Sequence, residues 1–89
     1  MYRLEFSDKA RKDVQKLSAT PKYYAKLEKF LEEIVLHPTT GTGKPEQLKH
    51  YEIPTWSRRI SDKHRLVYQI NESIVTVLVI AAYGHYEDK

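Results

Sequence analysis

The sequence predicts an α+β fold in which a mainly antiparallel, twisted sheet packs against two N-terminal helices, in the order β-α-α-β-β-β. After one short alternating segment, apolar residues recur at helical spacing as far as His37. The second half changes to runs rich in β-branched residues, which are separated by short polar loops typical of hairpins. With 89 residues, of which 40% are hydrophobic, the chain is expected to form a single domain, residues 1–89, around one modest core.

The N-terminal segment predicts a strand followed by a helix. Tyr2–Phe6 alternates as a short strand, and Ser7 is a favourable N-cap for a helix that begins at Asp8. The apolar face of this helix is marked by Ala10, Val14 and Leu17.

A second helix follows. Thr20-Pro21 gives a cap and then a proline at the first helical position, and the helix should end near His37 because Pro38 disfavours helical geometry before it. Lys29 and Glu33 stand four residues apart on its polar face, a spacing that favours an ion pair. Its apolar stripe is Tyr24, Leu27, Leu31 and Ile34, widened by Tyr23 and Phe30.

Three strands are expected after a polar loop at residues 39–43: Thr55–Ile60, His64–Ile70 and Ile74–Ala82. Three-residue loops join them, and a loop of that length fixes the register of a hairpin. The first hairpin should therefore place Arg59 opposite Arg65, Arg58 opposite Leu66 and Trp56 opposite Tyr68.

This register predicts a polar and an apolar face. The polar face holds Ser57, Arg59, Arg65 and Val67, and the core face under the helices holds Trp56, Ile60, Leu66, Tyr68 and Ile70. Like charges directly opposite in a hairpin repel, so a phosphate lying over Arg59 and Arg65 would stabilise the pair. The alternatives are that Glu52 or Asp62 pairs with these arginines, or that the register slips by one residue.

Composition excludes several classes of function. The absence of cysteine rules out disulfides and thiolate metal sites. Three of the four histidines, His37, His50 and His64, have no metal-ligand spacing, so no metal or cofactor is expected. The N-terminus has no signal-peptide pattern and the longest apolar run is too short to span a bilayer, which predicts a cytoplasmic protein without membrane contact. Residues 44–70 hold six Lys/Arg against three Asp/Glu, a local basic excess that suits nucleic acid.

Two residues are candidates for acid and base chemistry. Glu46 follows Lys44-Pro45 and precedes Lys49, and the two lysines would keep its carboxylate ionised and able to accept a proton. His85 lies just past the apolar strand, where an imidazole can donate a proton near neutral pH. Taken singly, each also fits an ordinary interpretation as an exposed loop glutamate or a surface histidine.

Four ordered motifs carry a resemblance that covers nearly the whole chain: residues 43–50 (GKPEQLKH), 56–60 (WSRRI), 64–68 (HRLVY) and 84–86 (GHY). Together they resemble the YoeB, or Txe, toxins of type II toxin-antitoxin systems, a branch of the RelE/ParE superfamily. The resemblance implies a RelE-like fold and a ribosome-dependent mRNA endoribonuclease, or mRNA interferase, that cuts in the A site and arrests translation.

The resemblance also implies roles for individual residues. Glu46 matches the general base, His85 the general acid and Arg65 the arginine that stabilises the phosphorane. Lys49, Arg59 and Tyr86 match residues that make supporting contacts to the substrate. With these roles, RNA is cleaved by transesterification without a metal or other cofactor, and DNA is not cut because it lacks the attacking 2′-hydroxyl.

The expected partners are the ribosome with its mRNA and a cognate antitoxin of the YefM/Axe kind, whose flexible tail would cover the basic face. The pair is expected to bind its operator DNA through the antitoxin, and a homodimer is left open. Two alternatives stand against the ribonuclease: a ParE-like toxin that inhibits gyrase by protein contact, and a non-catalytic module that binds nucleic acid through its arginines.

Overall fold

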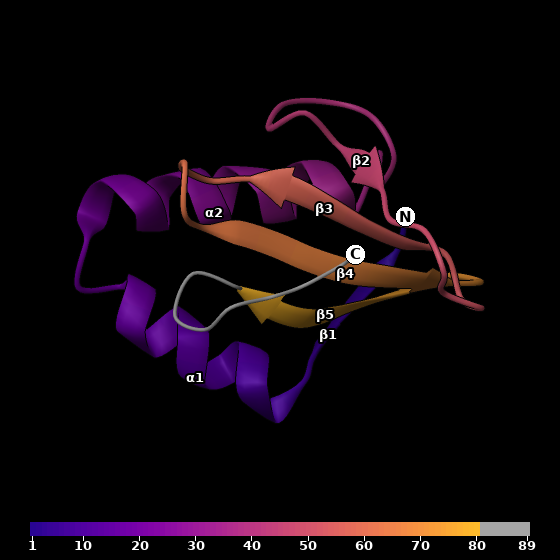
Figure 1. Ribbon diagram of the computed structural model, residues 1–89, viewed down its shortest axis with the longest axis horizontal. Helices are drawn as coiled ribbons and strands as arrows, with labels where there is room; N and C mark the ends of the chain where they lie inside the picture. Colours follow the sequence, from indigo (N-terminus) through magenta and orange to yellow (C-terminus); the bar gives the residue numbers. More distant parts are fainter. Residues whose placement is uncertain (81–89) are drawn as a thin grey trace.

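The computed structural model describes residues 1–80, with side chains described for residues 1–76. Its elements are β1 (Arg3–Phe6), α1 (Asp8–Leu17), α2 (Pro21–Ile34), β2 (Glu46–Gln47), β3 (Thr55–Arg59), β4 (Arg65–Asn71) and β5 (Ile74–Ile80). One five-stranded sheet has the order β1-β5-β4-β3-β2, in which β1 and β5 run parallel and the other neighbours run antiparallel (Figure 1). The predicted α+β class, with two N-terminal helices and a mainly antiparallel sheet, is confirmed.

The two helices begin as predicted, but the second ends early. The Ser7 hydroxyl caps α1 by accepting a hydrogen bond of 3.0 Å from the Ala10 N–H. Thr20 occupies the N-cap position of α2 without a side-chain capping bond. The helix ends at Ile34 and not near His37. In the turn that follows, the Glu33 carbonyl accepts bonds both from the Leu36 N–H at 3.0 Å, which has the tighter 3₁₀ spacing, and from the His37 N–H at 2.6 Å.

A single core lies between the helices and one face of the sheet. Figure 1 shows α2 behind β3 and β4, with α1 beside β1 and β5. The buried core residues come from the two helices, from β4 and β5, and from the position directly after β3: Ala10, Leu17, Leu27, Phe30, Ile34, Ile60, Leu66, Tyr68 and Val75. The predicted apolar stripes of both helices and the predicted core face of the first hairpin therefore meet here.

The first hairpin adopts the predicted register. Arg59 lies opposite Arg65, and the pairs Arg58 with Leu66 and Trp56 with Tyr68 follow, so the alternative of a one-residue slip is wrong. The sheet also contains a strand that was not predicted: β2 pairs antiparallel with β3 and carries Glu46. Two residues are too few to give a periodic signal, so only the pairing reveals this strand.

Candidate functional site

A cluster of polar side chains lies on the sheet face that points away from the helices. Pairing of β2 with β3 sets Glu46 opposite Ser57, and pairing of β3 with β4 sets Arg59 opposite Arg65. Residues two apart on a strand share a face, so Ser57 and Arg59 point to the same side. The tertiary structure therefore brings Glu46, Arg59 and Arg65 to one surface from three strands.

Glu46 and Arg65 are in direct reach of each other. The Arg65 Nη1 atom lies 3.7 Å from Glu46 Oε1 and 3.4 Å from the Ser57 hydroxyl oxygen. Both distances exceed those of a good hydrogen bond. The Arg65 side chain is 38% exposed and the Glu46 side chain is 67% exposed. An exposed pair of this kind adds at most about 1 kcal/mol to stability, so both groups stay available to a ligand.

The other predicted site residues are placed less closely. The exposed Arg59 side chain forms no ion pair with residues 1–76, and in that range neither Glu52 nor Asp62 pairs with Arg59 or Arg65. Lys49 is exposed in the turn after β2 and has no described bond to the Glu46 and Arg65 pair. The predicted His85 and Tyr86 lie outside the described residues.

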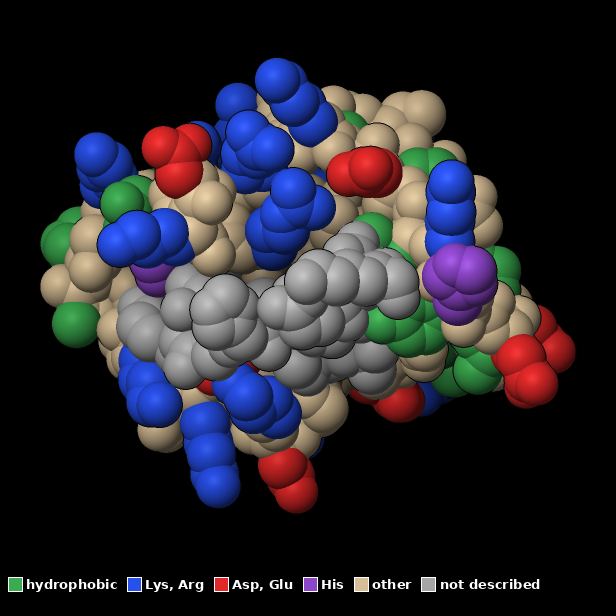
Figure 2. Space-filling view, in the orientation of Figure 1, with side chains coloured by type: hydrophobic (Ala, Val, Ile, Leu, Met, Phe, Trp, Pro, Cys, Tyr) green, Lys and Arg blue, Asp and Glu red, His purple; other side chains and the backbone are tan. Residues whose placement is uncertain are grey.

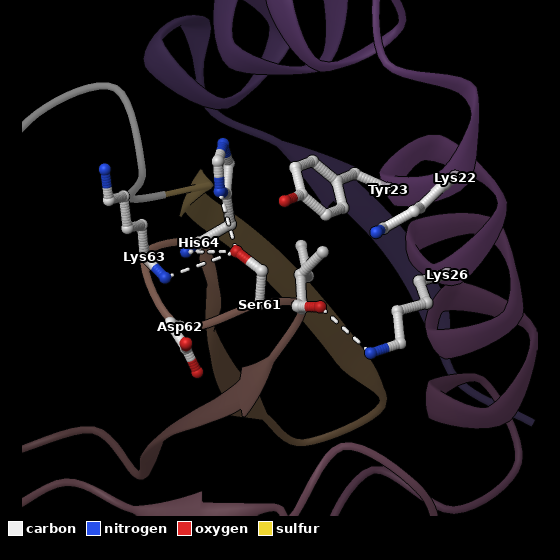
Figure 3. A pocket seen from close by; sticks show the side chains of 8 residues that line it. Lys22, Tyr23, Lys26, Ser61, Asp62, Lys63 and His64 are labelled. Carbon is white, nitrogen blue, oxygen red and sulfur yellow. Dashed lines mark hydrogen bonds between the residues drawn. The ribbon is translucent and has the colours of Figure 1, made fainter.

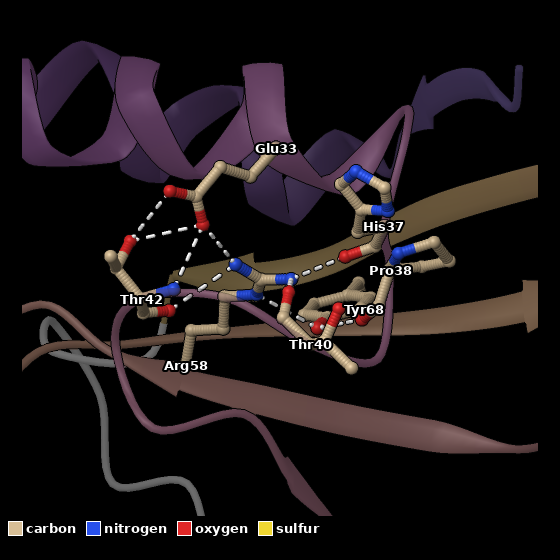
Figure 4. A network of polar contacts seen from close by, with 7 residues as sticks. All are labelled: Glu33, His37, Pro38, Thr40, Thr42, Arg58 and Tyr68. Atoms are coloured by element: carbon tan, nitrogen blue, oxygen red, sulfur yellow. Dashed lines mark hydrogen bonds and ion pairs between the residues drawn. The ribbon is translucent and has the colours of Figure 1, made fainter.

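Sequence reasoning missed a buried arginine next to this cluster. Arg58 points from β3 to the core face, where its side chain is fully buried (Figure 4). Its Nη1 atom donates to Glu33 Oε1 at 2.7 Å and to the Thr42 carbonyl at 3.2 Å. Its Nε atom donates to the Tyr68 hydroxyl at 3.1 Å.

The same guanidinium also holds the loop between α2 and β2. Its Nη2 atom donates to the carbonyls of His37 and Thr40, at 2.8 and 2.7 Å. The Tyr68 hydroxyl donates to the carbonyl of Pro38 at 2.6 Å, and burial raises the pKa of this tyrosine. Four loop carbonyls, including that of Thr42, are therefore tied to the sheet just before the chain enters β2.

Glu33 completes this network and corrects a prediction. Its carboxylate accepts bonds from the Thr42 N–H at 2.9 Å and from the Thr42 hydroxyl, in addition to Arg58. These donors, with the Thr42 backbone first, lower the pKa of Glu33 despite an opposing contribution from burial. The predicted ion pair with Lys29 is not formed, because the carboxylate turns to the buried cation.

The hairpin register contained the signal for this network. It placed Arg58 opposite the core residue Leu66, and a charged side chain on a core face needs a partner. The helix that packs against that face carries three carboxylates, Glu28, Glu32 and Glu33, and the structure shows that Glu33 is the partner. What the sequence did not reveal is the course of the loop that supplies the carbonyls.

Lys and Arg side chains gather over the upper part of the face in Figure 2, where Figure 1 places β2, β3 and α2. Within residues 1–80, no group of three or more His, Asp or Glu side chains could hold a metal ion. Neither helix in that range is both long and apolar enough to cross a membrane.

Comparison with known proteins places this geometry in context. Residues 6–86 match the family model described as a YoeB-like toxin of a bacterial type II toxin-antitoxin system. The toxin YoeB of Mycobacterium bovis is 42% identical over 70 residues, which are 79% of this chain and 80% of that protein.

Solved structures agree in fold. The YoeB dimer from Staphylococcus aureus superimposes with a TM-score of 0.81 at 30% identity, covering 96% of this chain and 98% of the other. The heterotetrameric YoeB-YefM complex from the same organism contains a chain that matches with a TM-score of 0.79 at 30% identity, with 97% and 99% covered. The RelE-RelB complex from Pyrococcus horikoshii shares the fold, with a TM-score of 0.74 at 17% identity over 88% of this chain and 90% of the other.

Proposed function

The chain belongs to the family of YoeB-like toxins of bacterial type II toxin-antitoxin systems, and from this membership we propose that it is a ribosome-dependent endoribonuclease that cleaves mRNA in the A site. The observation that carries the proposal is the convergence of Glu46 and Arg65, which lie 3.7 Å apart with both side chains partly exposed to solvent. A carboxylate can act as the general base and a neighbouring guanidinium can stabilise the charge on phosphorus, so the pair supplies two of the functions of a metal-free phosphodiester cleavage.

The proposed reaction is a transesterification. The Glu46 carboxylate takes the proton of a ribose 2′-hydroxyl, and the 2′-oxygen attacks the adjacent phosphorus in line with the departing 5′-oxygen. His85 protonates that leaving oxygen. The products are a 2′,3′-cyclic phosphate and a free 5′-hydroxyl.

Arg65 supplies the electrostatic part of the mechanism. Its fork of N–H donors binds the non-bridging oxygens as negative charge builds on the phosphorane, and it cannot lose its proton in doing so. Arg59 stands opposite it in the hairpin, so two guanidinium groups face one phosphate and the anion relieves their repulsion. Lys49 and Tyr86 are assigned as further substrate contacts.

The family match supports the assignment of the acid. It runs through residue 86 and so includes His85 and Tyr86, which follow β5. Because β5 lies next to β4, the chain leaves the sheet one strand away from Arg65. β5 runs antiparallel to β4, and its last residue, Ile80, pairs with Leu66, so the end of β5 lies beside Arg65 at the beginning of β4. This neighbourhood supports His85 as a contributor to the same site.

We further propose an antitoxin of the YefM kind as the partner that inhibits this chain in the cell. The Staphylococcus aureus YoeB is found with YefM in one structure and as a dimer in another. A flexible acidic tail would suit the basic surface around Arg59 and Lys44. A homodimer is proposed on the same grounds, and binding of operator DNA through the antitoxin stays a prediction.

The test is cleavage on translating ribosomes that carry a defined message. Purified wild type, Glu46→Ala and His85→Ala are added, and the 3′ ends are mapped by primer extension. Cuts within the A-site codon by wild type, lost in both variants, are the expected result. An uncut message together with gyrase-dependent DNA damage in cells would instead favour a ParE-like activity.

A further inference from the structure

An open cleft of about 790 Å³ lies between α2 and the turn that joins β3 to β4 (Figure 3). Lys22 and Lys26 reach into it from the helix, and Lys63 lines it from the turn. Its other polar lining residues are Tyr23, Ser61, Asp62 and His64. Cations from two separate elements therefore border one hollow.

This cleft continues toward the proposed catalytic cluster. A second hollow of about 300 Å³ shares Lys26 and Asp62 with it and adds Lys44 and Arg59 to its lining. Arg59 is the residue that stands opposite Arg65 in the hairpin. The two hollows form one groove from the arginine pair to the beginning of α2.

The groove is strongly cationic. Four lysines and one arginine line it, and Asp62 is its single carboxylate. None of the lining lysines forms an ion pair with another residue in the range 1–76. Their charges are therefore available to a polyanion, whose binding would gain from counterion release.

The walls of the groove are fixed before any ligand arrives. Lys26 Nζ donates to the Ile60 carbonyl at 3.0 Å and so ties α2 to the end of β3. In the turn, the Ser61 hydroxyl accepts bonds from the N–H groups of Lys63 and His64, at 3.2 and 3.0 Å. The His64 ring packs against the Tyr23 ring at a tilt of 41°, with 4.8 Å between centroids, which gives the cleft an aromatic wall.

We propose that this groove binds the phosphodiester backbone of single-stranded RNA, with Lys22 and Lys63 each contacting a phosphate and Tyr23 supporting a ribose or base. The inference rests on the proposed function in one respect: the RNA is taken to leave the catalytic cluster at Arg59 and to run along the groove toward the beginning of α2. The binding itself needs no cleavage. Aromatic side chains beside a cationic track are the usual elements of single-strand recognition.

The direct test measures RNA binding without catalysis. A fluorescent RNA oligonucleotide with 2′-O-methyl riboses cannot be cleaved, and its Kd is measured by anisotropy over a range of salt concentrations. The double variant Lys22→Gln/Lys63→Gln should bind more weakly, and the slope of log Kd against log salt should fall by about 1.4 for two lost phosphate contacts on a single strand.

Two further variants control for charge and folding. Arg11→Gln/Lys12→Gln removes the same charge from exposed positions on α1, which lines neither hollow, and should leave the Kd and its slope close to wild type. Asp62→Asn removes the carboxylate from the groove and should tighten binding. Misfolding would not produce such a gain.

The outcomes separate this inference from the proposed function. The binding test uses an oligonucleotide that cannot be cleaved, so a negative result in the ribosome cleavage assay would not affect the inference about the groove. Ribosomes with and without an uncleavable message distinguish mRNA from ribosomal RNA as the source of the backbone. Unchanged Kd and slope in Lys22→Gln/Lys63→Gln, or a loss confined to binding of an acidic antitoxin peptide, would overturn the proposal.

Discussion

Two arginines on neighbouring strands show how differently one side chain is used within this small sheet. Arg58 is fully buried and directs all its donors to Glu33, Tyr68 and loop carbonyls. Arg65 is 38% exposed and touches Glu46 and Ser57 only at long range. The buried group stabilises the fold, whereas the exposed one is free to bind a phosphate.

Replacing Arg65 should therefore affect activity and not stability. Arg65→Lys keeps the charge but loses the planar fork, and we expect the single-turnover cleavage rate to fall by about 10²- to 10³-fold. The free energy of unfolding should change by less than about 0.5 kcal/mol, because the side chain is exposed. Cleavage of programmed ribosomes and a urea titration give the two values; a rate within twofold of wild type would refute the role.

Replacing Arg58 should instead lower the stability of the fold. Arg58→Met leaves Glu33 and the loop carbonyls without their buried donor, and we expect a loss of about 3–5 kcal/mol of unfolding free energy. Arg59→Met is the matched control, since the adjacent side chain is exposed and should cost no more than about 0.5 kcal/mol. Equal losses in the two variants would show that burial of Arg58 is not what matters.

The lowered pKa of Glu33 makes stability depend on pH. A carboxyl whose pKa is lower in the folded than in the unfolded chain stabilises the fold above its unfolded pKa, and this stabilisation is lost as the pH falls through the folded value. Glu33→Gln should therefore be less stable than wild type at neutral pH, by about 2 kcal/mol for one charged hydrogen-bond network.

The difference in unfolding free energy between Glu33→Gln and wild type should narrow as the pH is lowered below 4.5, which is the ordinary pKa of this carboxyl. Denaturant titrations at a series of pH values measure it. The exposed neighbour Glu32 provides the control, because Glu32→Gln should follow wild type at every pH. A difference from wild type that stays constant down to the acid limit would contradict the assignment.

At the scale of elements, the loop between α2 and β2 determines where Glu46 lies. Besides the bonds from Arg58, the carbonyl of Gly43 accepts a 2.7 Å bond from the Arg59 N–H. Gly43 has a φ of +81°, and a Cβ built on it would lie 2.6 Å from the ζ carbon of the buried Phe30. The loop thus needs glycine here for conformation and for space.

Gly43→Ala should strain this loop and shift β2. We expect it to lower the unfolding free energy by about 1–3 kcal/mol, through the positive φ and the overlap with Phe30. Cleavage should also slow, because Glu46 is three residues further along. Thr39→Ala, at an exposed position of the same loop, is the control for both measurements. Full activity and stability in Gly43→Ala would show that the loop does not position the base.

At the scale of the whole molecule, one core joins both helices to the sheet. The β1 strand enters the sheet beside β5, so the beginning of the described chain is fixed only once its last strand is in place. Contacts between such distant segments favour all-or-none unfolding.

We therefore expect a single cooperative transition. Fluorescence of the single tryptophan, Trp56, reports on β3, and far-UV circular dichroism reports mainly on the helices. The two denaturation curves should coincide in wild type, and in Arg58→Met both should move together to lower denaturant. Separate midpoints for the two probes would contradict the expectation of a single domain.

Much of the fold followed from local rules. The Ser7 cap, the apolar helix stripes and the three-residue hairpin loop act over a few residues, so the helix starts and the register of Arg59 with Arg65 were predictable. The end of α2 was predicted too late, because Pro38 disfavours helical geometry only at the residue before it, whereas the helix ends at Ile34. The two-residue β2 gave no periodic pattern at all.

The candidate site, too, was predictable in part from the sequence and in part only from the tertiary structure. Its residue types and their order are properties of the sequence alone, and the four motifs from residue 43 to residue 86 indicated the toxin family before any contact was seen. The contact between Glu46 and Arg65, the burial of Arg58 and the groove beside α2 were decided by the tertiary structure. Each joins segments far apart in the chain, and their distances depend on loop paths and strand pairings that no local pattern specifies.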